Sequence, residues 1–137
     1  MNVVDASGWL EYFSDGPDAA FVAQVLQETD SLIVPTVTIL EVFGSVCRSH
    51  GEGAALQAAA AMQQGTVVNL DTAGALDAGR LSVMYGVSTS AGAVLAAAER
   101  HGATVWTLDE SVRQVPGVRF REPTGRRIPD PEPPKNW

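Results

Sequence analysis

Three acidic residues stand at the ends of apolar segments that lie far apart in the chain. Asp5 ends the first apolar run, Asp109 ends the run 104–108, and Glu41 lies inside an apolar stretch that follows Pro35. If these runs are strands and a helix of one parallel sheet, the carboxylates meet at its carboxyl edge. Clustered carboxylates repel one another and persist mainly where a divalent cation neutralises them. The pattern therefore predicts Asp5, Glu41 and Asp109 as metal ligands and catalytic residues in phosphodiester hydrolysis.

Two hydroxyl side chains accompany these acids. Ser7 follows Asp5 by two residues, and Thr107 precedes Asp109 by two residues. Ser7 could hold water bound at the site or fix the Asp5 carboxylate, and Thr107 has the matching position on the other strand. Hard oxygen ligands of this kind favour Mg²⁺ or Mn²⁺ over zinc. Ser7 and Thr107 are therefore assigned to supporting the bound cofactor.

Each acid also has a purely structural interpretation. Asp5 and Ser7 could simply cap the helix that follows them. Glu41 could be exposed on the polar side of an amphipathic helix, and Asp109 could cap a short helix that begins at Glu110. Asp71 and Asp77 flank a helix start and are interpreted as a cap and a solvent-facing residue, so neither is assigned to the site.

The sequence between these residues predicts alternating strands and helices. Strands are expected at 3–4, 32–34, 66–68 and 104–107, with a short fifth at 118–120. Helices are expected after Ser7 and at 17–28, 36–49, 52–64, 72–86 and 90–101. Strands alternating with helices of 10–15 residues are typical of βαβ units, which give a parallel sheet of four to five strands with helices on both faces.

The length of 137 residues suits one domain. We expect it to occupy residues 1–121, followed by a proline-rich, flexible tail over 122–137. The Arg126–Arg127 pair in that tail could touch RNA or a protein partner, or simply be solvated. No apolar stretch reaches the ~20 residues of a membrane span, and no signal peptide is expected. The single cysteine, Cys47, is typical of a protein of the reducing cytoplasm.

The net charge of −7 is unevenly distributed. Residues 1–112 carry three arginines against 13 acidic residues, a net charge of −10, whereas residues 113–137 carry six basic residues against three acidic ones, a net charge of +3. Because phosphate contacts need cations, the body is a poor general nucleic-acid binder. An anionic substrate would need bound metal or a partner's charge to offset the repulsion, and a basic protein partner would be attracted.

Three segments in this order resemble the PIN domain, and within it the VapC-type toxins of toxin–antitoxin modules. They are residues 1–10, residues 33–36 leading to Glu41, and residues 101–109. The resemblance covers about residues 1–120 and matches the family's acids at Asp5, Glu41 and Asp109 and its accessory hydroxyls at Ser7 and Thr107. It implies a three-layer α/β/α fold and an endoribonuclease that depends on Mg²⁺ or Mn²⁺. It also implies a homodimer that is inhibited by a cognate antitoxin.

The chain departs from this family at Ala91. The family usually has a fourth acid at the start of the helix before the last conserved strand, and here the segment 87–93 has none. Thr89 or Ser90 could cap that helix, but neither replaces a carboxylate. Three explanations stay open: a site that works with one metal, a variant disarmed for expression, and a degenerate copy that binds RNA or antitoxin without cutting. A phosphatase or phosphotransfer domain is a weaker alternative, because the only lysine, Lys135, lies in the tail.

Overall fold

The computed structural model describes residues 1–125 and contains five short strands, all paired in parallel. The strands are β1 (Asn2–Val4), β2 (Ile33–Pro35), β3 (Thr66–Val68), β4 (Thr104–Thr107) and β5 (Arg119–Phe120). β1, β4 and β5 form one ladder and β2 and β3 another. A single parallel bridge between Asn2 and Leu32 joins the two ladders, so the strand order across the molecule is β3-β2-β1-β4-β5. The predicted parallel sheet is confirmed.

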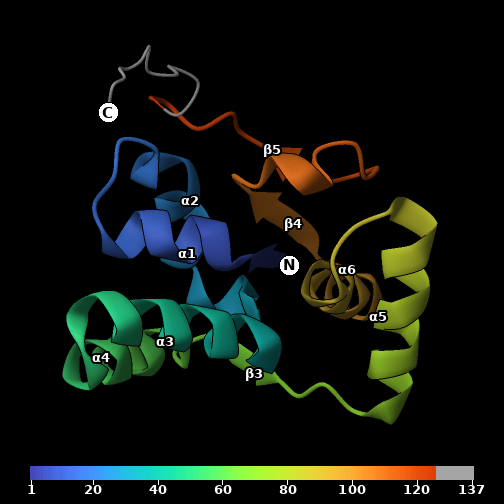
Figure 1. The fold of residues 1–137 in the computed structure, drawn as a ribbon, viewed down its shortest axis with the longest axis horizontal. Coiled ribbons are helices and arrows are strands. Elements are labelled where there is room, and N and C mark those ends of the chain that lie inside the picture. Colours follow the sequence, from blue (N-terminus) through green and yellow to red (C-terminus); the bar gives the residue numbers. More distant parts are fainter. Residues whose placement is uncertain (126–137) are drawn as a thin grey trace, which may run out of the picture.

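Helices fill every long connection between consecutive strands (Figure 1). They are α1 (Ala6–Phe13), α2 (Ala19–Leu26), α3 (Thr36–His50), α4 (Glu52–Met62), α5 (Thr72–Tyr85) and α6 (Thr89–His101). Two short 3-10 helices, η1 (Thr29–Ser31) and η2 (Glu110–Val112), precede β2 and follow β4. Each strand therefore runs in the same direction and ends at the same edge of the sheet.

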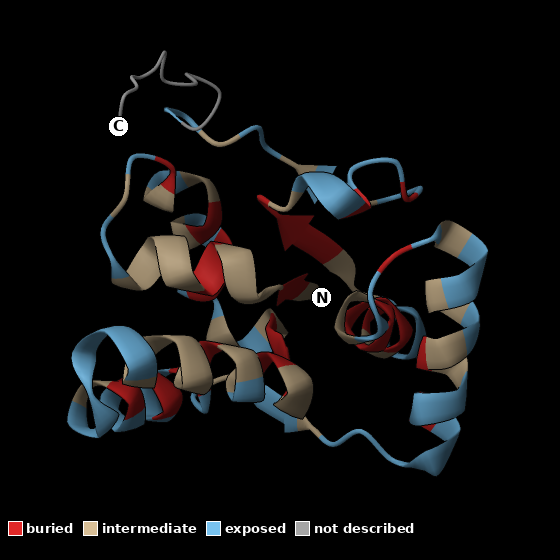
Figure 2. Ribbon diagram, viewed as in Figure 1, coloured by how far each residue is buried: buried red, intermediate tan, exposed pale blue. Residues whose placement is uncertain are grey.

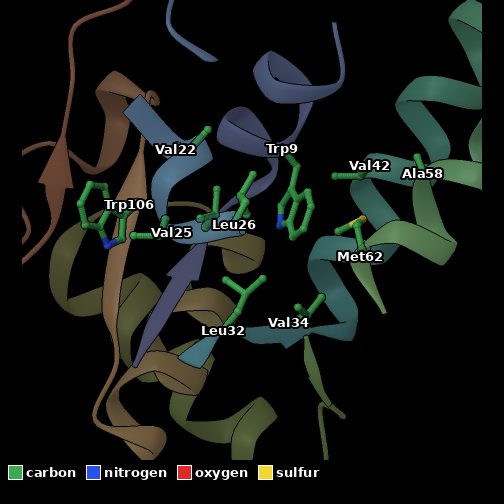
Figure 3. Close-up of a cluster of buried hydrophobic side chains, with 11 residues drawn as sticks. Trp9, Val22, Val25, Leu26, Leu32, Val34, Val42, Ala58, Met62 and Trp106 are labelled. Carbon is green, nitrogen blue, oxygen red and sulfur yellow. The ribbon is translucent and has the colours of Figure 1, made fainter. Parts of the chain in front are cut away.

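One layer of helices, α1 to α4, packs on the face of the sheet to which Val4, Val34 and Trp106 point. The side chains from the helices include Trp9 of α1 and Met62 of α4, and Figure 3 shows them converging on the strand residues. Because strand side chains alternate between faces, neighbouring residues of one strand supply different cores. Val4 thus belongs to this core, whereas Val3 points the other way.

The second layer is α6, covered in turn by α5. Val3 and Val105 of the sheet pack with Val94 and Leu95 of α6. Figure 2 shows α6 largely buried, whereas α5 turns an exposed side to solvent. Together the two helical layers and the sheet give the three-layer α/β/α arrangement.

The predicted elements are confirmed, but several predicted caps and ends are wrong. Asp5, not Ser7, caps α1, with its carboxylate accepting from the Gly8 N–H. Likewise Ser88, not Thr89 or Ser90, caps α6. In both helices the side chain that caps is the one whose backbone is still extended, which is the geometry an N-cap requires.

Two helices are also shorter than expected. α2 begins at Ala19 rather than 17 and ends at Leu26, and α4 ends at Met62 rather than 64. Cys47 on α3 is half-buried.

Gly92 sets the distance between α5 and α6. A Cβ atom added there would collide with the backbone carbonyl oxygen of Ala78 on α5, which cannot swing away as a side chain would. We therefore expect Gly92→Ala to push the two helices apart and to lower the free energy of unfolding by about 1–3 kcal/mol, as overpacking does. Urea denaturation measures this, with Gly79→Ala as control, because a Cβ at Gly79 meets no atom within 4 Å. Equal destabilisation by the two changes would contradict the close approach.

The C-terminal part of the predicted tail, residues 126–137, lies outside the described residues. Residues 122–125 are described, and Thr124 donates hydrogen bonds to Asp18. The expected boundary at 121 therefore falls within a segment that is bound to the domain. Within residues 1–125, no single helix combines the length and the apolar character of a membrane span; α5 and α6 reach both only jointly, with a bend of 113° between them.

Candidate active site

The three acids predicted from the sequence line one cleft. Asp5, Glu41 and Asp109 border a cavity of about 130 Å³ together with Ser7 and Ala91. Asp5 directly follows β1 and Asp109 lies two residues beyond β4, so parallel pairing of these strands brings the two together. Glu41 comes from the second turn of α3, which starts where β2 ends. The shared carboxyl edge of the sheet is thus what assembles the site.

The Asp5 carboxylate is held by two hydroxyl groups and one backbone amide. Ser7 Oγ donates to Asp5 Oδ1 at 2.5 Å, and Thr107 Oγ1 donates to Asp5 Oδ2 at 2.5 Å. The Gly8 N–H donates to Oδ1 at 3.3 Å. Of the two predicted roles for Ser7, the structure shows that it fixes the carboxylate.

The two hydroxyls also connect Asp5 to the segment after β4. Ser7 Oγ accepts from the Leu108 N–H at 2.9 Å, and Thr107 Oγ1 accepts from the Asp109 N–H at 2.8 Å. Each hydroxyl therefore donates a hydrogen bond to the Asp5 carboxylate and accepts one from a backbone N–H of the segment that carries Asp109. The position of one acid is thereby coupled to the position of the other.

Burial raises the pKa of the Asp5 carboxyl above its ordinary value of 3.8. The hydrogen bonds from Ser7, Thr107 and Gly8 act in the opposite direction, and the negative charge of Asp109 adds to the increase. Because burial outweighs the hydrogen bonds, the charged form of Asp5 is disfavoured when no cation is nearby.

Asp109 is both a helix cap and a wall of the cleft. Its Oδ1 accepts from the Ser111 N–H and from Ser111 Oγ, each at 2.9 Å, so it caps η2. The structural interpretation offered for Asp109 is therefore correct, but it does not exclude a functional one, because the residue also borders the cavity. Glu110 is exposed and pairs with Arg113 at 3.2 Å, away from the site.

Glu41 is half-buried and reaches the cleft from the helical layer opposite α6. No hydrogen bond or ion pair of its side chain is found within residues 1–125. A glutamate on a helix has three rotatable side-chain bonds, so its carboxylate can move within the cleft. Glu41 therefore lies in the wall of the cavity and is not simply exposed to solvent.

Comparison with known protein families identifies the family of this chain. Residues 3–118 match the PIN domain family. The chain belongs to the PIN domain family. No curated protein sequence gives a significant match, so the family rests on this domain match.

Several solved structures share the fold of this PIN domain. VapC20 of Mycobacterium tuberculosis, a Sarcin-Ricin loop cleaving toxin, has a TM-score of 0.73 and 19% identity, and the match covers 88% of this chain and 99% of that one. A toxin–antitoxin complex from Klebsiella pneumoniae has a TM-score of 0.71 and 18% identity, with 86% and 95% covered. The DNA-bound VapBC of Salmonella typhimurium has a TM-score of 0.69 and 16% identity, with 88% and 98% covered. At these identities the likeness establishes the three-layer PIN fold.

Ala91 stands at the position where the resemblance to the family leads us to expect a fourth acid. Ala91 is the third residue of α6, and it borders the same cavity as the three acids. Ser88 and Ser90, which border the cavity beside it, contribute hydroxyl groups only. A carboxylate at position 91 would therefore face the other acids across the cleft, and its absence leaves that wall neutral.

The chemistry of the donor set fits a hard divalent cation. The cleft offers three carboxylates and the hydroxyls of Ser7, Ser88 and Ser90, all oxygen donors. Thr107 is fully buried and does not border the cleft. Burial raises the pKa of Asp5, and a nearby cation would favour its charged form. Within residues 1–125, no three His, Cys, Asp or Glu side chains lie close enough together to hold one ion as they stand. Without a cation the three carboxylates repel one another and stay apart. To bind one ion together they must move closer, and the Glu41 side chain can make this movement.

One buried acid was missed by the sequence analysis. Asp18 lies between α1 and α2 and is 2% exposed. It accepts from Arg121 Nε at 2.8 Å, from the Thr124 N–H at 2.7 Å and from Thr124 Oγ1 at 2.8 Å. Asp18 therefore clamps the segment after β5 onto the first helical layer. Asp18 follows Gly16–Pro17 in a turn, and nothing in its local sequence distinguishes it from a solvated turn residue.

Burial raises the pKa of Asp18, but hydrogen bonds from Thr124 and Arg121 outweigh it, so that the pKa lies below its ordinary value of 3.8. The clamp therefore adds stability above this value and loses it as pH falls through the lower folded value. We expect Asp18→Asn to reduce the free energy of unfolding at pH 7 by about 2 kcal/mol, the scale of a hydrogen bond to a charged group. Urea denaturation at pH 7 and pH 3 measures this. The difference between variant and parent should shrink at pH 3, and an equal difference at both would contradict the charged clamp.

Proposed function

We propose that this PIN domain is a metal-dependent RNA endonuclease, the toxin of a toxin–antitoxin pair, with activity reduced by the missing acid at Ala91. The observation that carries the proposal is the single cleft bordered by Asp5, Glu41 and Asp109 at the carboxyl edge of the sheet. The fold it shares with a toxin–antitoxin complex and with an RNA-cleaving toxin supports the same function.

Asp5, Glu41, Asp109 and the two hydroxyl residues beside Asp5 have distinct parts in this proposal. Asp5 and Asp109 would hold Mg²⁺ or Mn²⁺, and Glu41 would either bind the same ion or orient a water molecule. Ser7 and Thr107 keep the Asp5 carboxylate facing the cleft through hydrogen bonds of 2.5 Å. The bound ion supplies activation of water and stabilisation of the charge that develops on phosphate.

The charge of the protein fits this assignment. Residues 1–112 have a net charge of −10, so an RNA strand is repelled from the acidic body unless a cation is bound there. The same charge suits an antitoxin segment that is basic. We further propose a cytoplasmic location, consistent with the single free thiol of Cys47.

Self-association is the remaining part of the proposal. α5 carries large apolar side chains on its outward side, with Leu76 57%, Val83 84% and Met84 67% exposed. Spacings of seven and eight residues place these side chains on one face of the helix. We propose that a second copy of the chain covers this face, and sedimentation equilibrium would then report twice the mass of one chain.

The decisive experiment is cleavage of a structured RNA pool with Mn²⁺, Mg²⁺ or EDTA. We expect slow cutting that requires Mn²⁺ or Mg²⁺ and stops in EDTA. Cutting that continues in EDTA would contradict a metal-dependent site. Folding of the protein in each buffer is followed by circular dichroism, so that loss of structure is not mistaken for loss of activity.

A second candidate is a binding module of the same fold that holds antitoxin or RNA without cutting. The neutral wall at Ala91 favours it, because fewer carboxylates hold a cation less tightly. The two candidates differ in the assay above. If neither the parent chain nor Ala91→Asp cuts any RNA while both are folded, the binding module becomes the better description.

A further inference from the structure

A second cavity adjoins the candidate catalytic cleft, and Ser7 and Asp109 border both. Its volume is about 360 Å³, within the ~300–1,000 Å³ typical of small-ligand sites. The other walls come from α1, from the turn before α2 and from the segment after β5. Because the two cavities share an acid of the cleft, a chain whose phosphate lies at the carboxylates can place its neighbouring unit in the second cavity.

The walls of this cavity are partly apolar and are held in place. Leu10, Pro17, Leu108 and Pro123 border it, and such side chains can pack against the flat face of a ring. Pro123 is fixed because its neighbours Arg121 and Thr124 are both bound to the buried Asp18. The hydrogen bonds of Asp18 therefore hold one wall of the cavity in place, although Asp18 has no part in the proposed cleavage reaction.

One polar group in this cavity has a fixed orientation. Glu11 Oε2 accepts from the Asp18 N–H at 2.7 Å, and Glu11 borders the cavity. The carboxylate also lies against Gly16, where a Cβ atom would collide with it, so the chain leaves room for the acid at that point. Its second oxygen remains a hydrogen-bond acceptor for a group inside the cavity.

We propose that this cavity binds the nucleobase adjacent to the cleaved phosphate, and that it selects a base carrying an exocyclic amino group. The inference rests on the proposed RNA substrate. The apolar side chains suit the face of a ring, and Glu11 has an oxygen left to accept from an N–H, whereas both oxygens of Asp18, which also borders the cavity, already accept from Arg121 and Thr124. Guanine fits best because it presents two neighbouring N–H donors to the carboxylate, and uracil fits least because carbonyl oxygens flank its N–H. Arg121 pairs with Asp18, which borders the cavity, and its side chain is half-exposed, so it can also pair with a passing phosphate.

The test measures binding without cleavage. Labelled hexauridylate and its variants with one central G, A or C are titrated with the full chain in Mn²⁺, within times too short for measurable cutting, and fluorescence anisotropy gives each Kd. We expect the G variant to bind about 5-fold or more tightly than hexauridylate, the lower limit for a good base contact. Equal binding of all four RNAs, or no measurable binding of any, would overturn the proposal.

Two variants and a control assign the preference to this cavity. Glu11→Gln keeps an oxygen for the Asp18 N–H but turns an amino donor toward the cavity, so the preference for G should disappear. Ser14→Trp, at an exposed residue on the rim, should fill the cavity and have the same effect even if Glu11→Gln folds poorly. Glu28→Gln removes one exposed charge that borders neither cavity, and it should leave the preference unchanged. An undiminished G preference in folded Glu11→Gln would place the contact elsewhere.

This test separates the subsite from the nuclease function. A chain that cuts RNA with no preference beside the cut would remove the subsite and leave the proposed function intact. A chain that prefers the G variant through Glu11 yet never cuts would keep the subsite and remove the nuclease.

Discussion

Replacing Asp5 by asparagine is expected to lower RNA cleavage by more than about 100-fold while leaving the fold intact. Loss of a residue that only supports a metal ligand typically lowers metal affinity or activity by about 10–100-fold. Asp5 is proposed as a ligand itself, so the loss of activity should exceed this range. Its carboxylate also accepts hydrogen bonds from Ser7 and Thr107, so the change disturbs the centre of the hydrogen-bond network. Initial rates of RNA cleavage in Mn²⁺ measure the effect.

The same change has a second, opposite effect on stability. Burial raises the pKa of Asp5, so the folded protein keeps a proton at pH values where the unfolded chain has released it. Stability therefore falls as pH rises from the ordinary value of 3.8 toward the higher folded value, and the loss persists at pH 7. Asp5→Asn removes the buried charge, so without metal it should be at least as stable as the parent at pH 7.

Thermal unfolding with and without Mn²⁺ provides the control for this prediction. Mn²⁺ should raise the Tm of the parent, because an ion that binds only the folded state stabilises it. It should not raise the Tm of Asp5→Asn. Asp71→Asn is the matched change, since Asp71 also caps a helix but lies outside the cleft. Cleavage at the parent rate by Asp5→Asn would refute the assignment of Asp5.

Introducing a carboxylate with Ala91→Asp is expected to strengthen Mn²⁺ binding and RNA cleavage by about 10–100-fold, the range of a metal ligand's support. Position 91 is the third residue of α6 and borders the cleft, so an acid there reaches the site and is favoured by the helix N-terminus. Isothermal titration with Mn²⁺ measures the affinity, and initial rates measure the activity.

The control for Ala91→Asp is a second acid on the same helix. Ala97 is also half-buried on α6 but borders a different cavity, so Ala97→Asp adds the same charge without reaching the three acids. Without metal, Ala91→Asp should be less stable than the parent because a fourth acid adds repulsion. An unchanged Mn²⁺ affinity would show that position 91 does not take part in the site.

The order of strands and helices could be predicted from the sequence because each one has a recognisable local pattern of apolar and turn residues. The run before Asp5 and the run 104–107 are apolar and bounded by turn residues, and both are strands. Parallel pairing followed from strand–helix alternation, and with it the expectation that residues after β1 and β4 share an edge. This is why Asp5 and Asp109 could be assigned to one site before the structure was known.

The residues that cap the helices could not be predicted from the local sequence. Asp5, Ser7 and the run 88–90 all contain residues that can cap a helix, and local sequence does not say which one keeps an extended backbone. The hydrogen bonds of Ser7 show why it is not the cap, because its hydroxyl is bonded to Asp5 and to Leu108, 101 residues away. A contact of that sequence separation leaves no trace in the local pattern.

The sequence by itself therefore determined the family of the fold, the strand ends and the acids that stand at them, since all of these depend on short-range patterns of apolar and polar residues. Only the tertiary structure decided that Ser7 and Thr107 both donate to Asp5, and that Asp18 is buried under Arg121 and Thr124. The physical reason is that burial and cavity walls depend on how whole helices pack across the sheet, and residues from separate segments contribute to each of them.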